Sequence, residues 1–186
     1  MNVRVACIGS RELNAYQTSM CEKLGGWVVQ CGHILDSGNA PGADQAFARG
    51  ANQFRPDLVH LHLPWYKFER QAIHDDNVVH ILDDLDEPHL KLYRQIAEKH
   101  HPAFSRLSQG AKKLMTRNSS ILLPPPVYFT VDMCLAIPSA KRGGGGTGQG
   151  MRIALHESIR LVDLRGYLDP DLFLLCEDIT KLEENQ

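Results

Sequence analysis

Long apolar segments and a strong net charge of either sign are both missing from this chain of 186 residues. No apolar run is long enough to span a bilayer, and the opening MNVRVACIGS lacks the extended apolar core of a secretory signal. We therefore expect a cytoplasmic protein with no membrane partner. Lys and Arg total 20 against 22 Asp and Glu, so the formal charge of −2 creates no overall field that attracts nucleic acid. Any site for a polyanion must be local.

Paired cysteine motifs and the P-loop motif are also absent. The five cysteines are odd in number and scattered, which predicts buried free thiols in a reducing compartment. His60-x-His62 would place two rings on one face of a strand, but no third ligand accompanies them, so we expect a structural role and no metal. Without G-x-x-x-x-G-K-[ST], a P-loop hydrolase is not expected.

The chain does contain short β-branched runs that alternate with helical segments. Strands are expected at 3–9, 33–38, 58–64, 127–137 and 159–164, and 77–82 fits either a strand or a helix edge. Helices are expected at about 15–29, 42–53, 88–100, 105–122 and 170–184, and a further helix is expected after the glycine turn, ending at about 158. This order predicts an α/β fold, a single Rossmann-like domain over residues 1–186 with a parallel sheet and helices on both faces.

Glycine-containing turns follow three of the expected strands, at 9–11, 37–44 and 143–150. In open parallel sheets, ligands bind outside the carboxyl ends of the strands. Each turn would present free backbone N–H groups at the start of a helix, where a phosphate or carboxylate is favoured. We therefore expect the turns to form one anion site at one edge of the sheet.

The last glycine turn has a second interpretation. Gly143-x-Gly145-x-x-Gly148 satisfies G-x-G-x-x-G, and Asp163 ends the next strand at about the spacing of a ribose-binding acid. This pattern is typical of a dinucleotide-binding unit, and NAD would then be the ligand. A run of glycines satisfies almost any glycine pattern, however, and this interpretation leaves the turn at 37–44 unexplained.

Several short motifs in order resemble the SLOG superfamily: CIGSRE, SGNAPGADQAFARGA, HLHLPW, MTRNSSIL and GGTGQGMRIA. That superfamily unites DNA-processing protein A (DprA) with the lonely-guy (LOG) phosphoribohydrolases. The resemblance covers approximately residues 3–164 and is strongest to the small DprA/LOG-like proteins of phage genomes. It implies a Rossmann-like sheet whose glycine loops bind a nucleotide or the phosphates of a nucleic acid.

The resemblance also implies which residues bind the ligand. The implied phosphate-binding residues are Gly9, Ser10, Arg11, Ser37, Gly38, Asn39, Gly42, Ala43, Asp44, Arg117, Asn118, Gly144, Gly145, Gly146, Thr147, Gly148 and Gln149. Asn39 departs from the family pattern, because it replaces the second glycine of Ser-Gly-Gly-Ala-x-Gly-Ala-Asp.

A second departure concerns catalysis. Phosphoribohydrolases of the superfamily carry Pro-Gly-Gly-x-Gly-Thr-x-x-Glu, and Gly150 stands here in place of that glutamate. Cleavage of an N-glycosidic bond needs a carboxylate near the ribose, for which Asp44, Glu12 and Asp132 are the candidates. We therefore rank nucleotide binding, in a sensor or sequestering protein, ahead of nucleoside 5′-monophosphate hydrolysis. In an enzyme, Asp44 and Arg117 would be the catalytic residues.

Other expectations concern partners. DprA-like binding of single-stranded DNA is a third hypothesis, ranked lower because no basic stripe is evident. No cofactor other than a nucleotide ligand is expected, and the superfamily implies a homo-oligomer in the cytoplasm, that of a bacterial host if the protein is phage-encoded. Trp65, Tyr66 and Phe68 are candidates for stacking on a base or for packing under a loop. The basic candidates beside the site are Lys112, Lys113, Lys141 and Arg142.

Overall fold

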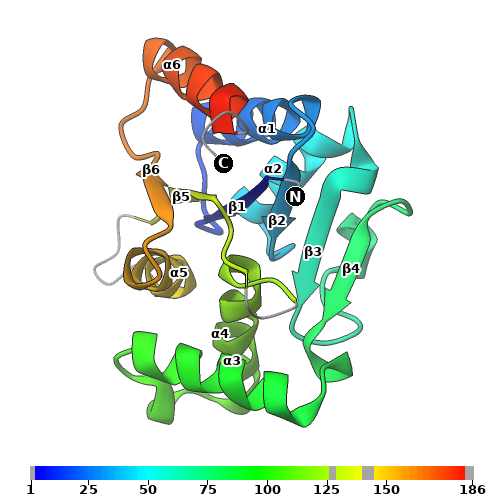
Figure 1. Ribbon diagram of the computed structural model, residues 1–186, viewed down its shortest axis with the longest axis vertical. Coiled ribbons are helices and arrows are strands. Elements are labelled where there is room, and N and C mark those ends of the chain that lie inside the picture. The colour runs from blue at the N-terminus through cyan, green and yellow to red at the C-terminus, as the bar shows by residue number, and fades with distance from the viewer. Residues whose placement is uncertain (1–2, 126–128, 140–144, 183–186) are drawn as a thin grey trace.

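The computed structural model describes residues 3–125, 129–139 and 145–182. Six strands form one sheet in the order β4-β3-β2-β1-β5-β6, and every neighbouring pair is parallel (Figure 1). The strands are β1 (Arg4–Gly9), β2 (Ile34–Ser37), β3 (Val59–Leu63), β4 (Val78–Ile81), β5 (Met133–Ile137) and β6 (Arg160–Asp163). The predicted α/β class and parallel sheet are confirmed.

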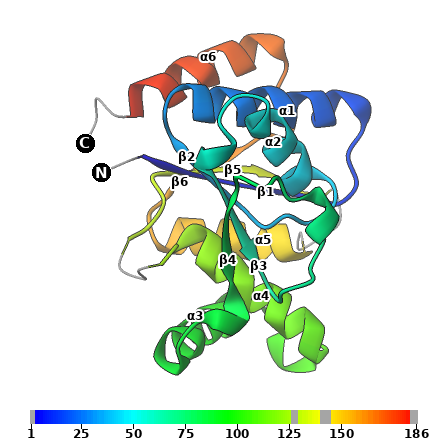
Figure 2. The same ribbon diagram turned by 90° about the vertical axis from the view of Figure 1, so that its right-hand side faces the viewer.

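Helices cover both faces of the sheet. They are α1 (Ala15–Gln30), α2 (Ala43–Asn52), α3 (Glu87–His100), α4 (Gln109–Leu122), α5 (Gly145–His156) and α6 (Asp169–Thr180). Figure 2 shows α1, α2 and α6 on one side of the sheet and α3, α4 and α5 on the other. The helices expected at 88–100 and 105–122 therefore lie with α5 on the second face.

Alternation along the strands explains the two layers. Val5 and Cys7 of β1 pack into the core beneath α1, α2 and α6, whereas Ala6 and Ile8 pack into the core beneath α3, α4 and α5. Successive side chains of a strand point to opposite faces, so a strand buried on both faces has to be apolar throughout. The continuous apolar run VACI in β1 is the sequence signal of this central position.

The path of the chain changes direction beside β1. From β1 it winds outward through β2 and β3 to β4, and it then returns to place β5 against the other side of β1. Val5 pairs with Met133 and Gly9 with Ile137, and the N–H of Ser10 extends this pairing by donating to the Ile137 carbonyl at 2.8 Å. Such a switch point leaves a crevice at the carboxyl ends of the two strands, where ligands of α/β proteins bind.

Several predicted boundaries were wrong. Of the strand expected at 127–137, residues 127 and 128 lie outside the described part, and 129–132 are not in the strand, which begins at Met133. The N–H of Val131 instead donates to the carbonyl of Leu122 at the end of α4. The helix expected from 105 begins at Gln109, after a 3₁₀ turn, because Ser108 caps it by accepting from the N–H of Ala111.

The ambiguous and terminal segments are also placed. Segment 77–82 contains a strand, β4, which pairs with β3. The last helix ends at Thr180 rather than near 184, and residues 183–186 lie outside the described part. None of the helices in the described ranges has the length and apolar character needed to cross a membrane.

Candidate functional site

A cavity of about 360 Å³ opens where the carboxyl ends of β1 and β5 meet the start of α5 and one face of α4. Its volume lies within the range of ~300–1,000 Å³ usual for small-molecule pockets. The cavity is lined by Ile8, Gly9, Ser10, Arg11, Glu12, Ala40, Asp44, Leu114, Met115, Arg117, Asn118, Ile121, Leu122, Ser139, Gly145, Gly146, Thr147 and Gly150. The turn at 37–44 and the start of α5 therefore share one cavity.

Glycine is required where the first two turns meet. A Cβ on Gly9 would lie 2.4 Å from the Cβ of Ala43, and a Cβ on Gly42 would lie 2.4 Å from the Ser10 carbonyl oxygen. Gly42 also has a φ of 93°, which side-chain-bearing residues rarely adopt. The close approach lets the N–H of Ala43 donate to the Ser10 carbonyl at 2.9 Å.

Asp44 joins these turns through its carboxylate. Oδ1 accepts from the N–H of Gly9 at 3.2 Å, and Oδ2 accepts from the N–H of Ala40 at 3.3 Å. Asn39, which precedes Ala40 in the second turn, has a φ of 56°, a left-handed conformation that asparagine tolerates better than most side-chain-bearing residues. The replacement of the family's glycine by Asn39 is therefore compatible with the same turn.

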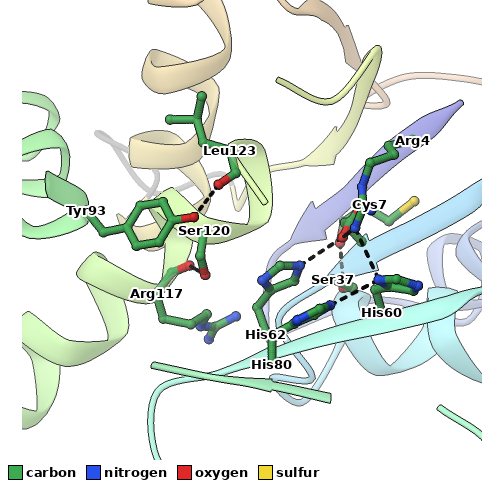
Figure 3. A network of polar contacts seen from close by, with 11 residues as sticks. Arg4, Cys7, Ser37, His60, His62, His80, Tyr93, Arg117, Ser120 and Leu123 are labelled. Atoms are coloured by element: carbon green, nitrogen blue, oxygen red, sulfur yellow. Dashed lines mark hydrogen bonds and ion pairs between the residues drawn. The ribbon is translucent and has the colours of Figure 1, made fainter. Parts of the chain in front are cut away.

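Arg117 brings a buried positive charge to the cavity from α4. The residue is 3% exposed, and its nearest carboxylate oxygen, Oδ2 of Asp44, lies 3.7 Å from Nη1. Its Nε is sealed from solvent and has no hydrogen-bond partner among the described residues. The guanidinium points from α4 toward the strands that carry Ser37 and His62 (Figure 3).

The guanidinium of Arg117 packs against Gly38 and Phe68. A Cβ on Gly38 would lie 1.3 Å from Nη1 of Arg117, so any side chain at this position would displace the guanidinium. The Cζ atom of Arg117 lies 5.6 Å from the centre of the Phe68 ring, within the range of a cation–π contact. Gly38 is thus required by the packing of Arg117.

The charges of Asp44 and Arg117 are poorly compensated. Burial raises the pKa of Asp44, and this outweighs the opposing effects of Arg117 and of the two backbone N–H groups. Burial likewise lowers the pKa of Arg117, although Asp44 opposes the shift. At 3.7 Å the pair is too long for a hydrogen bond, so both groups lose hydration without gaining a strong partner.

Part of the cavity wall is apolar. Leu114, Met115, Ile121 and Leu122 project from α4, and Ile8 projects from β1. These residues were not predicted as site residues. Their spacing along α4 is a helical stripe that continues the positions of Arg117 and Asn118, and this was the available sequence signal.

The predicted site residues fall into three groups. Those that line the cavity are Gly9, Ser10, Arg11, Asp44, Arg117, Asn118, Gly145, Gly146 and Thr147. Those that do not line it are Ser37, Gly38, Asn39, Gly42, Ala43, Gly148 and Gln149. Gly144, Lys141 and Arg142 lie outside the described residues.

Two of the non-lining residues have structural contacts. The Ser37 hydroxyl donates to the Cys7 carbonyl at 2.6 Å in the interior of the sheet. Gln149 is fully buried, and its side-chain amide contacts the backbone of Ala97 and Met115. Their side chains are therefore turned toward the interior of the protein.

The candidate carboxylates are separated by the fold. Asp44 and Glu12 line the cavity. Asp132 was a wrong candidate, because it precedes β5 and accepts from the N–H of Arg4, at the opposite ends of the strands. Asp163 pairs with Arg165 and does not line the cavity. Gly150, at the position of the family's glutamate, does line it.

The aromatic and lysine candidates also lie outside the cavity lining. Trp65 and Phe68 pack edge to face at 5.3 Å between ring centres, and the Tyr66 ring is covered by Arg70. Lys113 pairs with Asp83 at 2.6 Å, and Lys112 does not line the cavity.

A second polar cluster lies on the sheet face that α3, α4 and α5 cover. The Arg4 guanidinium donates to both oxygens of Asp36 at 2.9 and 2.6 Å, and Nε2 of His62 lies 2.8 Å from the same carboxylate. His60 and His80 contact each other beside them, at 3.0 Å between ring nitrogens (Figure 3). Within the described ranges, no three ligating side chains are placed to hold a metal ion.

Comparison with known proteins finds similarity at the level of structure. No family model matches the sequence, and no curated protein matches it. The structure is similar to that of DNA processing protein A (DprA) from Streptococcus pneumoniae, with a TM-score of 0.41 and 17% sequence identity over 87% of this chain. This chain spans 58% of the length of that structure.

Proposed function

We propose that the cavity binds the phosphate group of a nucleotide or of a nucleotide-derived small molecule. The observation that carries the proposal is the buried guanidinium of Arg117, a residue that lines the cavity, has no carboxylate within hydrogen-bonding distance and has an unpartnered Nε. A buried charge without a close partner is costly, and an anion in the cavity would relieve that cost. Phosphate suits a guanidinium because two N–H groups can bind two of its oxygens.

The start of α5 supplies further donors to the cavity. Gly145, Gly146 and Thr147 form the first turn of this helix and line the cavity. The first N–H groups of a helix have no acceptor within the helix, and the helix dipole adds a partial positive charge there. Arg11 adds an exposed positive charge at the cavity edge. These groups favour an anion more strongly than a neutral ligand.

The apolar part of the cavity wall, on α4 and β1, favours a ligand larger than inorganic phosphate. Ile8, Leu114, Met115, Ile121 and Leu122 offer the kind of surface that a base or sugar ring contacts. The resemblance to the SLOG superfamily supports a nucleotide as the ligand. The likeness to the small phage-encoded members of that superfamily supports a homo-oligomer that senses or sequesters this nucleotide.

Native mass spectrometry and calorimetry test this proposal. The purified protein is expected to carry, or to bind when titrated, a member of a panel of ribo- and deoxyribonucleoside phosphates. Arg117→Met is expected to weaken that binding at least ten-fold, because a charged hydrogen bond contributes about 1.5–3 kcal/mol. Lys112→Met removes the same charge from the same helix outside the cavity and is expected to bind normally. Equal affinity of both variants, or no binding to wild type, would overturn the proposal.

Hydrolysis of a nucleoside 5′-monophosphate is a second candidate function. It is favoured by the carboxyl group of Asp44, which lines the cavity and whose pKa is raised by burial, as a general acid requires. Both oxygens of Asp44 already accept backbone N–H groups, which favours a positioning role instead. Release of free base by wild type that is abolished in a folded Asp44→Asn variant would establish hydrolysis. If nucleotide binds and no base is released, the function is binding without hydrolysis.

Binding of single-stranded DNA is an outcome that the same experiments can reveal. It would appear as affinity for an oligonucleotide that exceeds the affinity for any mononucleotide and that falls steeply with salt.

A further inference from the structure

Hydrogen bonding allows only one orientation of the side-chain amide of Gln149. Its Nε2 lies 3.2 Å from the Ala97 carbonyl oxygen and 3.2 Å from the Met115 carbonyl oxygen. Both neighbours can only accept, so the atom that faces them must be the NH₂ group. The Oε1 atom of Gln149 is therefore fixed as an acceptor on the other side.

This fixed acceptor orients the next amide, that of Asn118. Nδ2 of Asn118 lies 3.1 Å from Oε1 of Gln149 and 3.3 Å from the carbonyl oxygen of Gly146. Both of these are acceptors, so the NH₂ group of Asn118 must face them. The remaining atom, Oδ1, then has no hydrogen-bond donor among the described residues, although Asn118 lines the cavity.

We infer that Oδ1 of Asn118 is a specificity-determining acceptor for an N–H or O–H donor on the part of the ligand beyond its phosphate. Such a donor is an amino group of a base or a hydroxyl group of a sugar. The inference rests on the proposed function and deepens it, because Arg117 and Asn118 are consecutive on α4 and both line the cavity. One would neutralise the phosphate, and the other would select the group attached to it.

The orientation cannot be reversed without loss. A flip of Asn118 would place its oxygen against Oε1 of Gln149 and the Gly146 carbonyl, leaving three acceptors facing one another. A ligand that presents an acceptor at this position therefore meets a fixed oxygen. A site built in this way discriminates by leaving a polar group unpaired when the wrong ligand binds.

Pairs of ligands that differ by one donor test the inference. Calorimetry compares AMP with purine riboside 5′-monophosphate, and GMP with IMP, which differ by one amino group. It also compares AMP with 2′-deoxy-AMP, which differ by one hydroxyl. In at least one pair, wild type is expected to favour the donor-bearing member about ten-fold. The pair that shows the preference identifies the donor as an amino group or a sugar hydroxyl.

Three variants test whether the preference arises from the hydrogen-bonded side-chain amides of Gln149 and Asn118. Asn118→Ala is expected to bring the two affinities of that pair to within about two-fold of each other, with the phosphate still bound. Gln149→Met is expected to reduce the preference because Asn118 can then rotate. Gln109→Ala removes an exposed amide from the same helix, outside the cavity, and is expected to keep the preference.

The outcomes separate the two proposals. If wild type binds the members of every pair equally, or if folded Asn118→Ala keeps the wild-type preference, the inference is wrong and phosphate binding stands. If wild type binds none of these phosphates, the proposed function is wrong and the inference with it. Circular dichroism identifies a variant that does not fold, and equal wild-type affinities in every pair overturn the inference without any variant.

Discussion

Two buried aspartates in this protein differ in how they are partnered. Asp36 is held by both the guanidinium of Arg4 and the ring of His62, with three donor–acceptor distances between 2.6 and 2.9 Å. Asp44 has its nearest guanidinium nitrogen at 3.7 Å and two longer bonds from backbone N–H groups. Both side chains are buried, so their difference is one of partners rather than of solvent exposure.

The pKa values of the two carboxyl groups follow this difference. Burial alone would raise the pKa of Asp36, but the hydrogen bonds and charges of His62 and Arg4 hold it below its usual value. At Asp44 burial prevails and the pKa is raised. A fully paired charge inside a sheet is a structural element, whereas an incompletely paired one beside a cavity is available to a ligand.

The largest expected effect comes from breaking the well-paired cluster. Asp36→Ala leaves Arg4 and His62 without their acceptor and is expected to lower the free energy of unfolding by about 3–5 kcal/mol. Urea unfolding measures this change. A loss below about 1 kcal/mol would show that the cluster is not the structural element we describe.

A smaller stability effect is expected on the cavity side. Arg117→Met is expected to lower the free energy of unfolding by about 1–2 kcal/mol, because Asp44 keeps its two backbone donors and its raised pKa lets it take up a proton. The same urea titration compares it with Asp36→Ala. Equal losses in the two variants would remove the distinction between the clusters.

The histidines beside Asp36 make the free energy of unfolding depend on pH. Burial is the main reason that the pKa of His60 is lowered to about 4 and that of His80 to about 3. Between these values and the ordinary histidine pKa of about 6.5, the unfolded chain binds more protons than the folded one. The contribution of these histidines to the free energy of unfolding is therefore fully present above about pH 6.5 and is lost progressively as the pH falls toward 4.

The experiment compares unfolding at several pH values in wild type and His80→Leu. The slope between about pH 6.5 and 4 is expected to be smaller in the variant, because one of the titrating groups is gone. The lowered pKa of Asp36 acts in a separate window, since its contribution is lost only below about pH 4. Identical slopes in the two proteins would contradict the assignment to the histidines.

The smallest expected effect is a pH dependence of anion affinity. An anion near Arg117 also lies near Asp44 and would raise the pKa of that carboxyl further, so binding takes up protons. The affinity for sulfate, which does not titrate in this range, is expected to rise on the order of three-fold from about pH 7 to about pH 5. Calorimetry measures it, and an affinity that falls with decreasing pH would place the anion elsewhere.

Much of this arrangement was readable from the sequence because its causes are local. The apolar run of β1 predicts a strand buried on both faces, and the turns after it predict close backbone approach. Gly9 and Gly42 meet this expectation at a single contact point. Arg117 could be connected with the cavity only through the family resemblance, since nothing in its own neighbourhood distinguishes it from a surface arginine.

The remaining features depend on contacts between distant segments. Gln149 was predicted to bind phosphate, but the carbonyl groups of Ala97 and Met115, on α3 and α4, turn its side chain inward. The pairing of Asp36 with His62 and Arg4 required the order β3-β2-β1 and its register. The apolar stripe of α4 was visible in the sequence, but it could be assigned to a site only once the helix had been placed beside Gly146.

The pairing of β1 with β5 has a consequence for the synthesis of this protein. Arg4 and Asp132 bond across 128 positions of the chain, and the walls of the cavity come from both ends of that interval. Contacts between such distant segments form late in folding. On the ribosome, a nascent chain that stops short of β5 and α5 would lack the part of the pocket that Ser139 and the start of α5 provide, so ligand capture would report that β5 and α5 have joined the sheet.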